Sequence, residues 1–447
     1  MDLNGKKVLV IGTGVSGIAA TGLLVECGAK VVLYDGNKEL TEESIYEKLG
    51  FRESVTVSIG EYPSDADLLV ISPGVSIYSP IVEEYEKLNI PVWGEIELAY
   101  NYEKGNVIAI TGTNGKTTTT TLVGEIMKAY CDKTYVVGNI GNPYTREVLK
   151  TSEESYTVAE ISSFQLETIH TFAPKVSAIL NITPDHLDRH KTMENYVLAK
   201  ESICKNQKSD DVCVVNIDDE YLKDFNPGNC KIVGFSRFKK PEVGAYLDGD
   251  MIMYTDGKAD YEVINVYDMQ IIGTHNYENV MAAVAITYNM GVPLDVIIAS
   301  IKAFKGVEHR IEYVRTHKGV IYYNDSKGTN TDASIKAINA MTRPTILIAG
   351  GYDKKIEFDD FIKAFEGKVK KMVLIGVTRN KIAETAEKYG FKDYVFVDDL
   401  RAAVMECYKS AVDGDAVLLS PACASWDMFK GYEQRGRLFK EYVNELD

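Results

Sequence analysis

A glycine-rich segment with a lysine and two threonines, Gly112-Thr-Asn-Gly-Lys-Thr-Thr118, has the residue types that bind phosphate groups. It follows a β-branched apolar run at 106–110 and precedes an amphipathic segment at 118–130, which predicts strand, loop and helix in that order. Glycines let the backbone approach an anion, and the N–H groups at the start of the helix point towards it. We expect Lys116 to reach the outer phosphates and the Thr117 hydroxyl to ligate Mg²⁺. An ordinary glycine turn beside a surface lysine is the alternative.

A second glycine loop lies near the N-terminus. The apolar run 6–11 leads into Gly12-Thr-Gly-Val-Ser-Gly17, and a second strand ends at Asp35. This spacing is typical of a dinucleotide-binding unit, but the same turn can hold any diphosphate. Another strand-to-loop junction at 68–74 ends in Ser72-Pro-Gly74, although Gly74 could equally serve only the turn. Two such loops predict a crevice at the carboxyl ends of parallel strands.

Three charged residues follow in the middle of the chain. Glu160 ends an apolar strand, where a carboxylate can bind Mg²⁺ directly or through water, or can simply be solvated. His186 lies in a polar run, 181–190, directly after a buried strand, so it could ligate a metal, bind substrate or be structural. By its spacing alone, Lys200 is expected to be an ordinary exposed lysine.

The last third of the chain also contains polar segments that are expected to be loops. Segments 323–330, 350–354 and 420–429 each come directly after a strand-like run, so we expect them to meet at one edge of a sheet and to form a binding site. Before them, Asn276 stands near the start of a helix, where it could be the N-cap. Arg310 lies at a domain boundary, from where an arginine can reach phosphate across a cleft.

Length and composition set the outer limits. The chain has 447 residues, enough for about three domains, and 45% of them are hydrophobic. A net charge of -16 argues against a broad nucleic-acid surface but not against local phosphate binding. We expect neither a membrane-spanning helix nor a signal peptide. The seven scattered cysteines indicate reduced residues of a cytoplasmic protein rather than a disulfide framework or a zinc site.

Strand-like and helical segments alternate along the whole chain, which predicts an α/β fold of three consecutive domains. We place the boundaries at residues 1–100, 101–306 and 307–447, because polar segments interrupt the alternation near 98–105 and 306–310.

Taken together, these motifs resemble the Mur ligase family of ATP-dependent amide-forming enzymes, over the whole chain. Segments 111–118 and 276–279 are similar to the ATP loop and adenine contact shared by the family. The longer blocks 160–167, 325–330 and 419–425 resemble the member that adds D-glutamate. The family's fold implies a Rossmann-like N-terminal domain that holds UDP rather than NAD, a central P-loop ATPase domain with a parallel sheet, and a Rossmann-like C-terminal domain.

The resemblance also implies individual roles. ATP is expected at Gly112, Thr113, Asn114, Gly115, Lys116, Thr117, Thr118, Asn276, Asn279, Arg310 and Asp325. Two Mg²⁺ ions are expected at Thr117, Glu160, His186 and Lys200, with Lys200 carbamylated. The UDP-sugar is expected at Val15, Ser16, Asp35, Gly36, Ser72, Gly74, Asn139 and His186. D-Glutamate is expected at Thr329, Lys354, Ser425 and Tyr432, where Tyr432 replaces the phenylalanine expected from the family. Lys116, Glu160, His186 and Lys200 would be the catalytic residues.

The implied reaction joins D-glutamate to UDP-N-acetylmuramoyl-L-alanine through an acyl phosphate, a cytoplasmic step of peptidoglycan precursor synthesis, in a monomer with small-molecule partners only. Another amino-acid-adding ligase of the same type is an alternative. An NAD-dependent oxidoreductase would leave the phosphate loop unexplained, and a nucleotide-dependent switch would leave the polar loops of the third domain unexplained.

Overall fold

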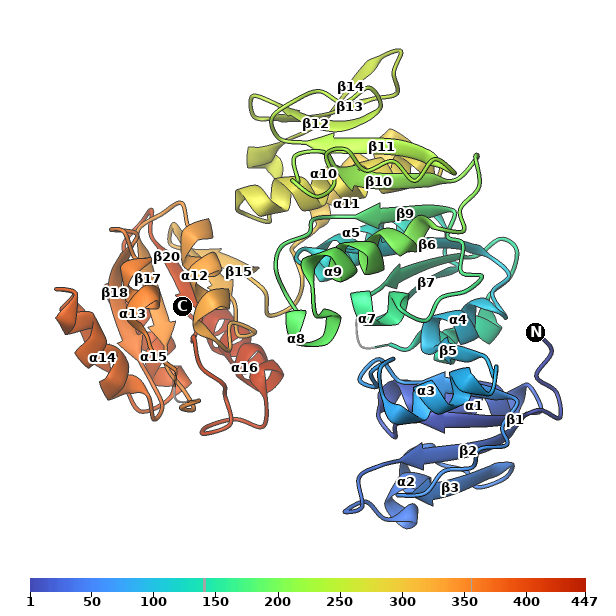
Figure 1. Cartoon of the computed structure of the whole chain (residues 1–447). Helices are drawn as coiled ribbons and strands as arrows, with labels where there is room; N and C mark the ends of the chain where they lie inside the picture. The colour runs from blue at the N-terminus through green and yellow to red at the C-terminus, as the bar shows by residue number, and fades with distance from the viewer. Residues whose placement is uncertain (140–141, 355) are drawn as a thin grey trace. The chain divides into compact units, whose positions relative to one another are not determined.

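The structure is a computed structural model that describes residues 1–139, 142–354 and 356–447. It divides into two compact units. The first comprises Met1–Val266 with Glu278–Ile301, and the second comprises Tyr267–Tyr277 with Lys302–Asp447. Across the described residues, the strands form three sheets of five, nine and six strands (Figure 1). The α/β class predicted from the sequence is therefore confirmed, while the domain boundaries placed at 100 and 306 stay predictions.

The first sheet is entirely parallel, with strand order β3-β2-β1-β4-β5. Its strands are β1 (Lys7–Ile11), β2 (Lys30–Asp35), β3 (Val55–Ile59), β4 (Leu68–Ile71) and β5 (Val92–Gly94). Helices α1 (Val15–Glu26), α2 (Glu42–Leu49) and α3 (Pro80–Lys87) connect them. The strand order reverses between β1 and β4, and ligands of open α/β sheets bind at such a reversal.

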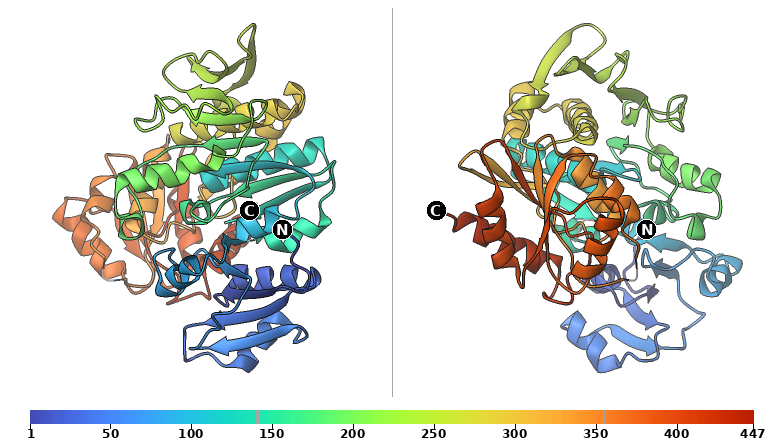
Figure 2. Two further views of the ribbon diagram at one scale, coloured as in Figure 1. Left: turned by 45° about the vertical axis from the view of Figure 1, so that its right-hand side comes forward. Right: turned by 90° about the vertical axis from the view of Figure 1, so that its left-hand side faces the viewer.

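The second sheet carries the central part of the chain, in the order β14-β13-β12-β11-β10-β9-β6-β8-β7. Its parallel strands are β6 (Asn106–Thr111), β7 (Thr134–Gly138), β8 (Tyr156–Glu160), β9 (Val176–Ile179), β10 (Val212–Asn216), β11 (Lys231–Ser236) and β12 (Gly244–Asp248). Strands β13 (Met251–Thr255) and β14 (Asp260–Asn265) are antiparallel additions at one edge (Figure 2).

Helices surround this second sheet. They are α4 (Glu95–Tyr100), α5 (Lys116–Tyr130), α6 (Tyr144–Glu147), α7 (Ser163–Leu166), α8 (Leu187–His190), α9 (Met193–Glu201), α10 (Thr274–Asn289) and α11 (Leu294–Ala303). Helix α5 packs on β7 and β8, so the helix that follows the phosphate loop is fixed against the strand that ends in Glu160.

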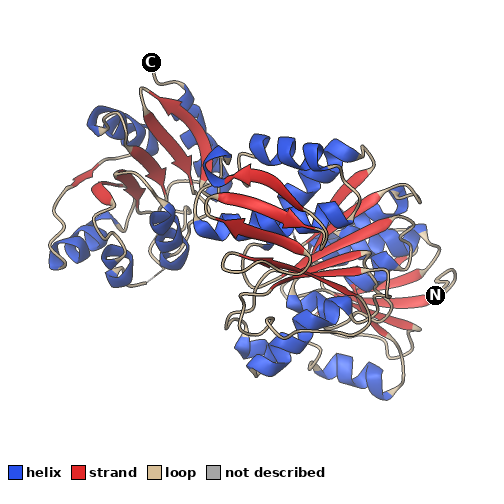
Figure 3. Cartoon of the chain, turned by 90° about the horizontal axis from the view of Figure 1, so that it is seen from above, coloured by secondary structure: helices blue, strands red, loops and turns tan. Residues whose placement is uncertain are grey.

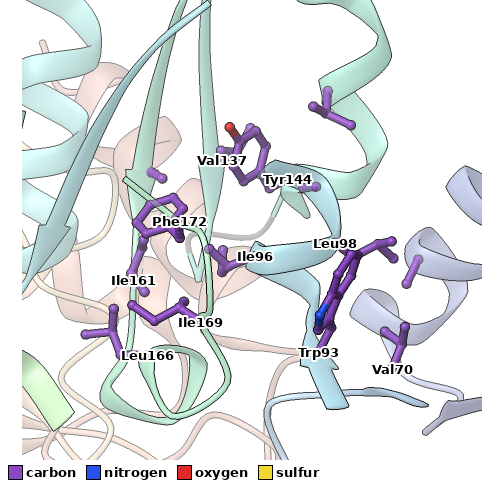
Figure 4. Packing of buried hydrophobic residues seen from close by; sticks show 14 of the residues in the cluster. Val70, Trp93, Ile96, Leu98, Val137, Tyr144, Ile161, Leu166, Ile169 and Phe172 are labelled. Carbon is purple, nitrogen blue, oxygen red and sulfur yellow. The ribbon is translucent and has the colours of Figure 1, made fainter. Parts of the chain in front are cut away.

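One continuous hydrophobic core joins the first two sheets into a single unit. Trp93 of β5 and Ile96 of α4 belong to the same cluster as Val70 of the first sheet and Phe172, which precedes β9 of the second sheet (Figure 4). Helix α4 also buries a carboxylate, Glu97, which accepts hydrogen bonds from the backbone N–H groups of residues 170–172. Buried polar groups are kept only when their hydrogen bonds are made, so these contacts add specificity to the apolar packing.

The third sheet forms the core of the second unit, in the order β15-β16-β20-β17-β18-β19. Its strands are β15 (Glu312–His317), β16 (Val320–Asn324), β17 (Thr345–Ala349), β18 (Val369–Leu374), β19 (Tyr394–Phe396) and β20 (Ala416–Leu419). All neighbouring pairs are parallel except β15 with β16. Helices lie on both faces of this sheet (Figure 3): α12 (Thr331–Ala340), α13 (Asp359–Lys363), α14 (Arg379–Lys388), α15 (Leu400–Ser410) and α16 (Tyr432–Asn444).

Two global expectations from composition can be compared with the structure. All seven cysteines are free thiols, as expected. Within the described residues, no helix is long and apolar enough to cross a membrane.

Candidate functional site

The phosphate loop has the predicted context, with β6 before it and α5 beginning at Lys116. Two of its glycines are required by space and by conformation. Gly115 has a φ of +83°, and a Cβ there would lie 2.3 Å from Oδ1 of Asn279. Gly112 has a φ of +155°, and a Cβ there would lie 2.9 Å from the Leu180 side chain. Only glycine leaves the backbone of this loop free to approach a ligand closely.

The loop is held in place by the segment after β9. The backbone N–H of Asn114 donates to Oδ1 of Asn181 at 2.8 Å, and Asn181 donates back to the Asn114 carbonyl at 3.1 Å. Thr113 completes the attachment through its hydroxyl, which lies 2.9 Å from the Tyr196 hydroxyl. Asn279 of α10 accepts a hydrogen bond from Thr119 of α5 at 3.3 Å, so it lies beside the phosphate loop, as its assignment as an ATP contact requires.

Lys116 is folded over the loop that it follows. Its ammonium group donates to the carbonyls of Gly112 at 2.7 Å and Thr113 at 3.0 Å. Thr117 is partly buried in the first turn of α5. The positive charge, the hydroxyl and the positive end of a 15-residue helix therefore lie together, which is the arrangement that attracts phosphate.

Glu160 has one satisfied and one unsatisfied carboxylate oxygen. Its Oε1 accepts a hydrogen bond of 2.8 Å from Nδ2 of Asn139, which follows the neighbouring strand β7. Its Oε2 is buried and has no hydrogen-bond partner among the described residues. A buried anionic oxygen without a partner is costly, so it is a suitable position for a cation ligand. The alternative of a solvated strand-end glutamate does not fit, because Glu160 is 1% exposed.

His186 lies at the end of the polar run after β9. Its backbone is left-handed, with a φ of +52°, and its side chain is about half exposed. The imidazole stacks near Phe164 at a ring distance of 4.9 Å, and its Nε2 is 3.6 Å from Oδ2 of Asp185. These contacts leave the ring accessible to a ligand.

The structure corrects the expectation that Lys200 is exposed. Its side chain is 1% exposed, with its ammonium 4.7 Å from the centre of the Tyr196 ring. Burial, and to a lesser extent the positive charge of Lys116, lower the pKa of Lys200 to about 7. The sequence gives no sign of this, because helix α9 (Met193–Glu201) buries Lys200 together with Tyr196 through tertiary packing. A neutral amine is thus accessible at physiological pH.

Two of the four residues predicted to hold Mg²⁺, Glu160 and His186, are of the acidic or histidine types that commonly ligate metals. Among the described residues, no group of three or more His, Cys, Asp or Glu side chains is arranged to hold a metal ion. Mg²⁺ usually keeps several waters and binds through one or two carboxylates plus substrate phosphates. The unpartnered oxygen of Glu160 beside a phosphate loop fits that kind of site.

Arg189 is a residue whose importance the sequence did not reveal. Its guanidinium donates to the carbonyls of Pro73 at 2.7 Å and Val75 at 3.0 Å, in the loop after β4. It also donates to Glu167 at 2.7 Å. It thereby ties the Ser72–Gly74 loop of the first sheet to the His186 segment of the second, beside a small pocket lined in part by Ser72, Gly94, Glu95 and Gln165. Its place in a charged run after a buried strand was the one available signal.

The glycine loops of the first sheet meet at the strand-order reversal, as predicted. A Cβ on Gly12 would lie 2.7 Å from Oγ of Ser72, so the loops after β1 and β4 are in contact. Asp35 accepts hydrogen bonds from the N–H and the hydroxyl of Thr13 at 3.0 and 2.7 Å. Burial alone would raise the pKa of Asp35, but these hydrogen bonds outweigh it and lower the pKa. Of the other predicted UDP-sugar residues, Val15 and Ser16 begin α1, Gly36 directly follows β2, and Gly74 lies in the loop after β4. Asn139 and His186 instead follow strands of the second sheet.

In the second unit, the three polar loops follow three neighbouring parallel strands, β16, β20 and β17. This confirms that they share one edge of the sheet. Asp325, at the end of β16, accepts hydrogen bonds from the Ser420 hydroxyl at 2.6 Å and from the backbone N–H of Ile311 at 3.2 Å. Burial raises the pKa of Asp325 to about 7 against these hydrogen bonds.

Three of the four residues predicted for D-glutamate, Thr329, Lys354 and Ser425, lie on these loops, and Tyr432 follows the last of them. Lys354 is exposed, and its ammonium lies 5.4 Å from the centre of the Trp426 ring, which is 64% exposed. Ser425, in contrast, is 2% exposed. Tyr432 begins α16, and its carbonyl accepts a hydrogen bond from Ser326 at 2.8 Å. Thr329, partly buried, precedes α12.

Two further predicted ATP residues also belong to the second unit. Helix α10 begins at Thr274, so the alternative role of Asn276 as the N-cap does not hold. Asn276 lies in the first turn and donates to the carbonyl of Ile272 at 2.7 Å. Arg310 is partly buried beside Asp325, whose pKa it lowers.

Comparison with known proteins agrees with this geometry. The family profiles of the MurD-like N-terminal domain, the Mur ligase middle domain and the Mur ligase glutamate ligase domain match residues 6–94, 110–287 and 309–423. A protein of Lachnospira eligens, named UDP-N-acetylmuramoylalanine--D-glutamate ligase, is 62% identical over 100% of both chains. The chain belongs to the Mur ligase family.

Other relatives of this Mur ligase carry the same name. One from Clostridioides difficile is 47% identical over 100% of both chains. Among solved structures, the UDP-N-acetylmuramate-alanine ligase of Thermotoga maritima superposes with a TM-score of 0.60 at 20% identity. The match covers 98% of the Mur ligase described here and 99% of the Thermotoga chain. The MurF ligase of the same organism, solved with ADP, gives a TM-score of 0.56 at 16% identity. These structures share the fold of this Mur ligase.

Proposed function

We propose that this Mur ligase joins D-glutamate to UDP-N-acetylmuramoyl-L-alanine in an ATP-dependent reaction, as a cytoplasmic step of peptidoglycan precursor synthesis. The observation that carries the proposal is full-length identity of 62% to a ligase of that name, together with the strand-loop-helix geometry around Lys116. We further propose that the enzyme acts as a monomer on small molecules, without nucleic acid.

The chemistry requires an activated carboxylate. The alanine carboxylate attacks the terminal phosphorus of ATP, ADP leaves, and an acyl phosphate forms. The amine of D-glutamate then attacks the acyl carbon, and the tetrahedral intermediate expels phosphate to give the amide, while the amine loses a proton. Both ATP and the carboxylate are anionic, so positive groups at the phosphate loop must offset their repulsion. Lys116, placed over the loop carbonyls, is the protein's own cation for this role.

Magnesium is the proposed cofactor, in two sites. Thr117, Glu160, His186 and a modified Lys200 are the proposed ligands. When bound, Mg²⁺ neutralises charge on phosphoryl oxygens and orients them. The unpartnered, buried Oε2 of Glu160 supports this assignment, since a carboxylate oxygen in such a place needs a cation or a donor. Asn139 fixes the orientation of that carboxylate by binding its other oxygen.

Carbamylation of Lys200 is supported by its burial. Only the neutral amine reacts with CO₂, and a pKa of about 7 makes the neutral form abundant at physiological pH. The product is an anion whose oxygens suit Mg²⁺. The positive charge of Lys116, which disfavours the ammonium form of Lys200, would favour the carbamate.

A direct assay tests the proposed function. Phosphate release is measured with ATP, UDP-N-acetylmuramoyl-L-alanine and a panel of amino acids that includes D-glutamate, L-lysine and diaminopimelate. We expect release to require the UDP-sugar and to be fastest with D-glutamate. A better rate with another amino acid would overturn the substrate assignment and retain a Mur-type ligase, whereas release without any amino acid would overturn ligation itself.

A further inference from the structure

The three loops proposed to bind D-glutamate follow three different strands. Their positions relative to one another must therefore be fixed by contacts between the loops or with a common partner. A buried side chain from α16 is such a partner. Arg435 is 1% exposed, although arginine is rarely buried unless it is paired. It lies in the second unit, as do all the residues discussed below.

Arg435 hydrogen bonds to two of the loops at once. Its Nε and Nη2 donate to the hydroxyl and the carbonyl of Ser326, at 3.0 and 2.8 Å. Its Nη1 donates to the carbonyl of Cys423 at 3.2 Å. Ser326 stands three residues before Thr329, and Cys423 two residues before Ser425. The rigid fork of the guanidinium therefore fixes the spacing between two residues assigned to the same substrate.

The third loop is in contact with the same group. A Cβ on Gly351 would lie 3.5 Å from Nη1 of Arg435, so the backbone of that loop passes beside the guanidinium. The loop is also joined to the Cys423 loop, because the N–H of Tyr352 donates to the carbonyl of Ala424 at 2.9 Å. Lys354 follows two residues after this attachment.

Among the described residues, Arg435 forms no close ion pair, although the carboxyl groups of Asp427 and Asp325 favour its charged form from farther away. Its hydrogen-bond acceptors are two carbonyls and a hydroxyl, and within the described part of the chain no carboxylate lies within 4 Å of its nitrogens. Burial lowers the pKa of Arg435 to about 10, so the group stays positive near neutral pH. A fixed positive charge under these loops favours an anionic ligand, and its effect is stronger in a buried site than in water.

We propose that Arg435 is a positioning residue for the amino-acid substrate: it sets the spacing of the Thr329, Lys354 and Ser425 loops and adds a buried positive charge that favours a dicarboxylate. This inference rests on the proposed function, because it takes the site of D-glutamate from it. It assigns Arg435 no contact with the reacting atoms.

Two substitutions and one control test the inference in the full-length enzyme. R435K keeps the charge and loses the fork, whereas R435M keeps much of the length and loses both. R437Q removes an exposed arginine two residues further along the same helix. Steady-state rates are measured with each of the three substrates varied in turn, and folding is checked by circular dichroism melting.

We expect R435K to raise the KM for D-glutamate about tenfold, and R435M to raise it about a hundredfold, while the KM values for ATP and the UDP-sugar change less than about twofold. Saturating D-glutamate should restore most of kcat in R435K. R437Q should match the unmodified enzyme in all three KM values.

Three outcomes would overturn the inference. These are a D-glutamate KM of R435K equal to that of the unmodified enzyme, a joint rise of all three KM values, and an R437Q variant that reproduces the R435K effect. If R435M fails to fold, R435K alone decides the question. Failure of the proposed function would show differently, as an unmodified enzyme that does not use D-glutamate at all.

Discussion

Nδ2 of Asn139 donates a hydrogen bond of 2.8 Å to Oε1 of Glu160, and this contact leaves the buried Oε2 of Glu160 as the oxygen without a partner. Asn139 directly follows β7, and Glu160 ends the adjacent strand β8. Asn139 is proposed to contact the UDP-sugar, and Glu160 is proposed to bind the metal. The hydrogen bond between them therefore connects the two proposed binding sites.

Glu160→Gln should lower turnover by about a hundredfold or more, because the amide is a neutral and weaker ligand for Mg²⁺. The variant should also need a higher Mg²⁺ concentration for half-maximal phosphate release, and a Mg²⁺ titration measures this. Glu153→Gln, at an exposed position before β8, is the control. An unchanged Mg²⁺ requirement in Glu160→Gln would remove Glu160 from the metal site.

Lys116→Ala should abolish ligation, because it removes the cation that lies over the phosphate loop. Binding of the UDP-sugar to the first sheet should persist, which isothermal titration calorimetry can measure. Lys128→Ala, near the end of the same helix α5, should leave ligation intact because Lys128 is exposed. Turnover like that of the unmodified enzyme in Lys116→Ala would refute the assignment of the phosphate loop.

Lys200 should carry a carbamate, since its pKa of about 7 leaves the amine largely neutral above that pH. Carbon-13 spectroscopy in the presence of labelled bicarbonate should show a carbamate signal that strengthens as pH rises through 7 and that disappears in Lys200→Ala. The signal should survive in Lys191→Ala, at an exposed lysine before α9. A signal that persists in Lys200→Ala would place the modification elsewhere.

Lys354→Ala should raise the KM for D-glutamate by roughly tenfold to a hundredfold, because a charge-assisted hydrogen bond is worth roughly 1.5–3 kcal/mol. The requirements for ATP and the UDP-sugar should change little. Lys392→Ala, at an exposed lysine before β19, is the matched control. Equal D-glutamate KM values for the two variants would show that Lys354 does not select the substrate.

Asp325 should make the unliganded protein less stable as pH rises. Its folded pKa of about 7 lies above the ordinary value of 3.8, so the folded state holds a proton that the unfolded state has released. The stability that this proton confers is complete below pH 3.8 and is lost progressively up to about pH 7. Asp325→Asn, which cannot ionise, should show a smaller fall in melting temperature between pH 4 and 7. If the melting temperatures of both proteins fell by the same amount between pH 4 and 7, the raised pKa of Asp325 would be contradicted.

The sequence predicted the parts of the fold that rest on local pattern. The strands before the phosphate loop and before Glu160 are continuous apolar runs, and their glycine or polar ends are easily recognised. Strand β15 is not evident from the sequence, because Glu312–His317 lies at a sheet edge, is partly exposed along its length and lacks an apolar run.

The site residues also fall into two groups, those that the local sequence predicts and those whose role depends on tertiary contacts. Lys116 and Glu160 stand at predictable junctions between a strand and a loop. The burial of Lys200 and the roles of Arg189 and Arg435 could not be predicted from local pattern, because each depends on partners from distant segments. Arg189 contacts carbonyls more than a hundred positions away, and Arg435 contacts Ser326 from 109 positions away. Helical periodicity predicts which face of a helix a residue lies on, but it does not predict which distant segment that residue contacts.

The chain has two tryptophans, and they lie in very different surroundings: Trp93 is 7% exposed in the core of the first unit, whereas Trp426 is 64% exposed in the second, beside Lys354. A solvated indole emits at longer wavelength than a buried one and is quenched by aqueous iodide. The red, quenchable part of the intrinsic fluorescence therefore reports on the loop proposed to receive D-glutamate, and the blue part on the core beneath the UDP-sugar loops. The enzyme thus contains its own two-colour optical probe, without any attached dye.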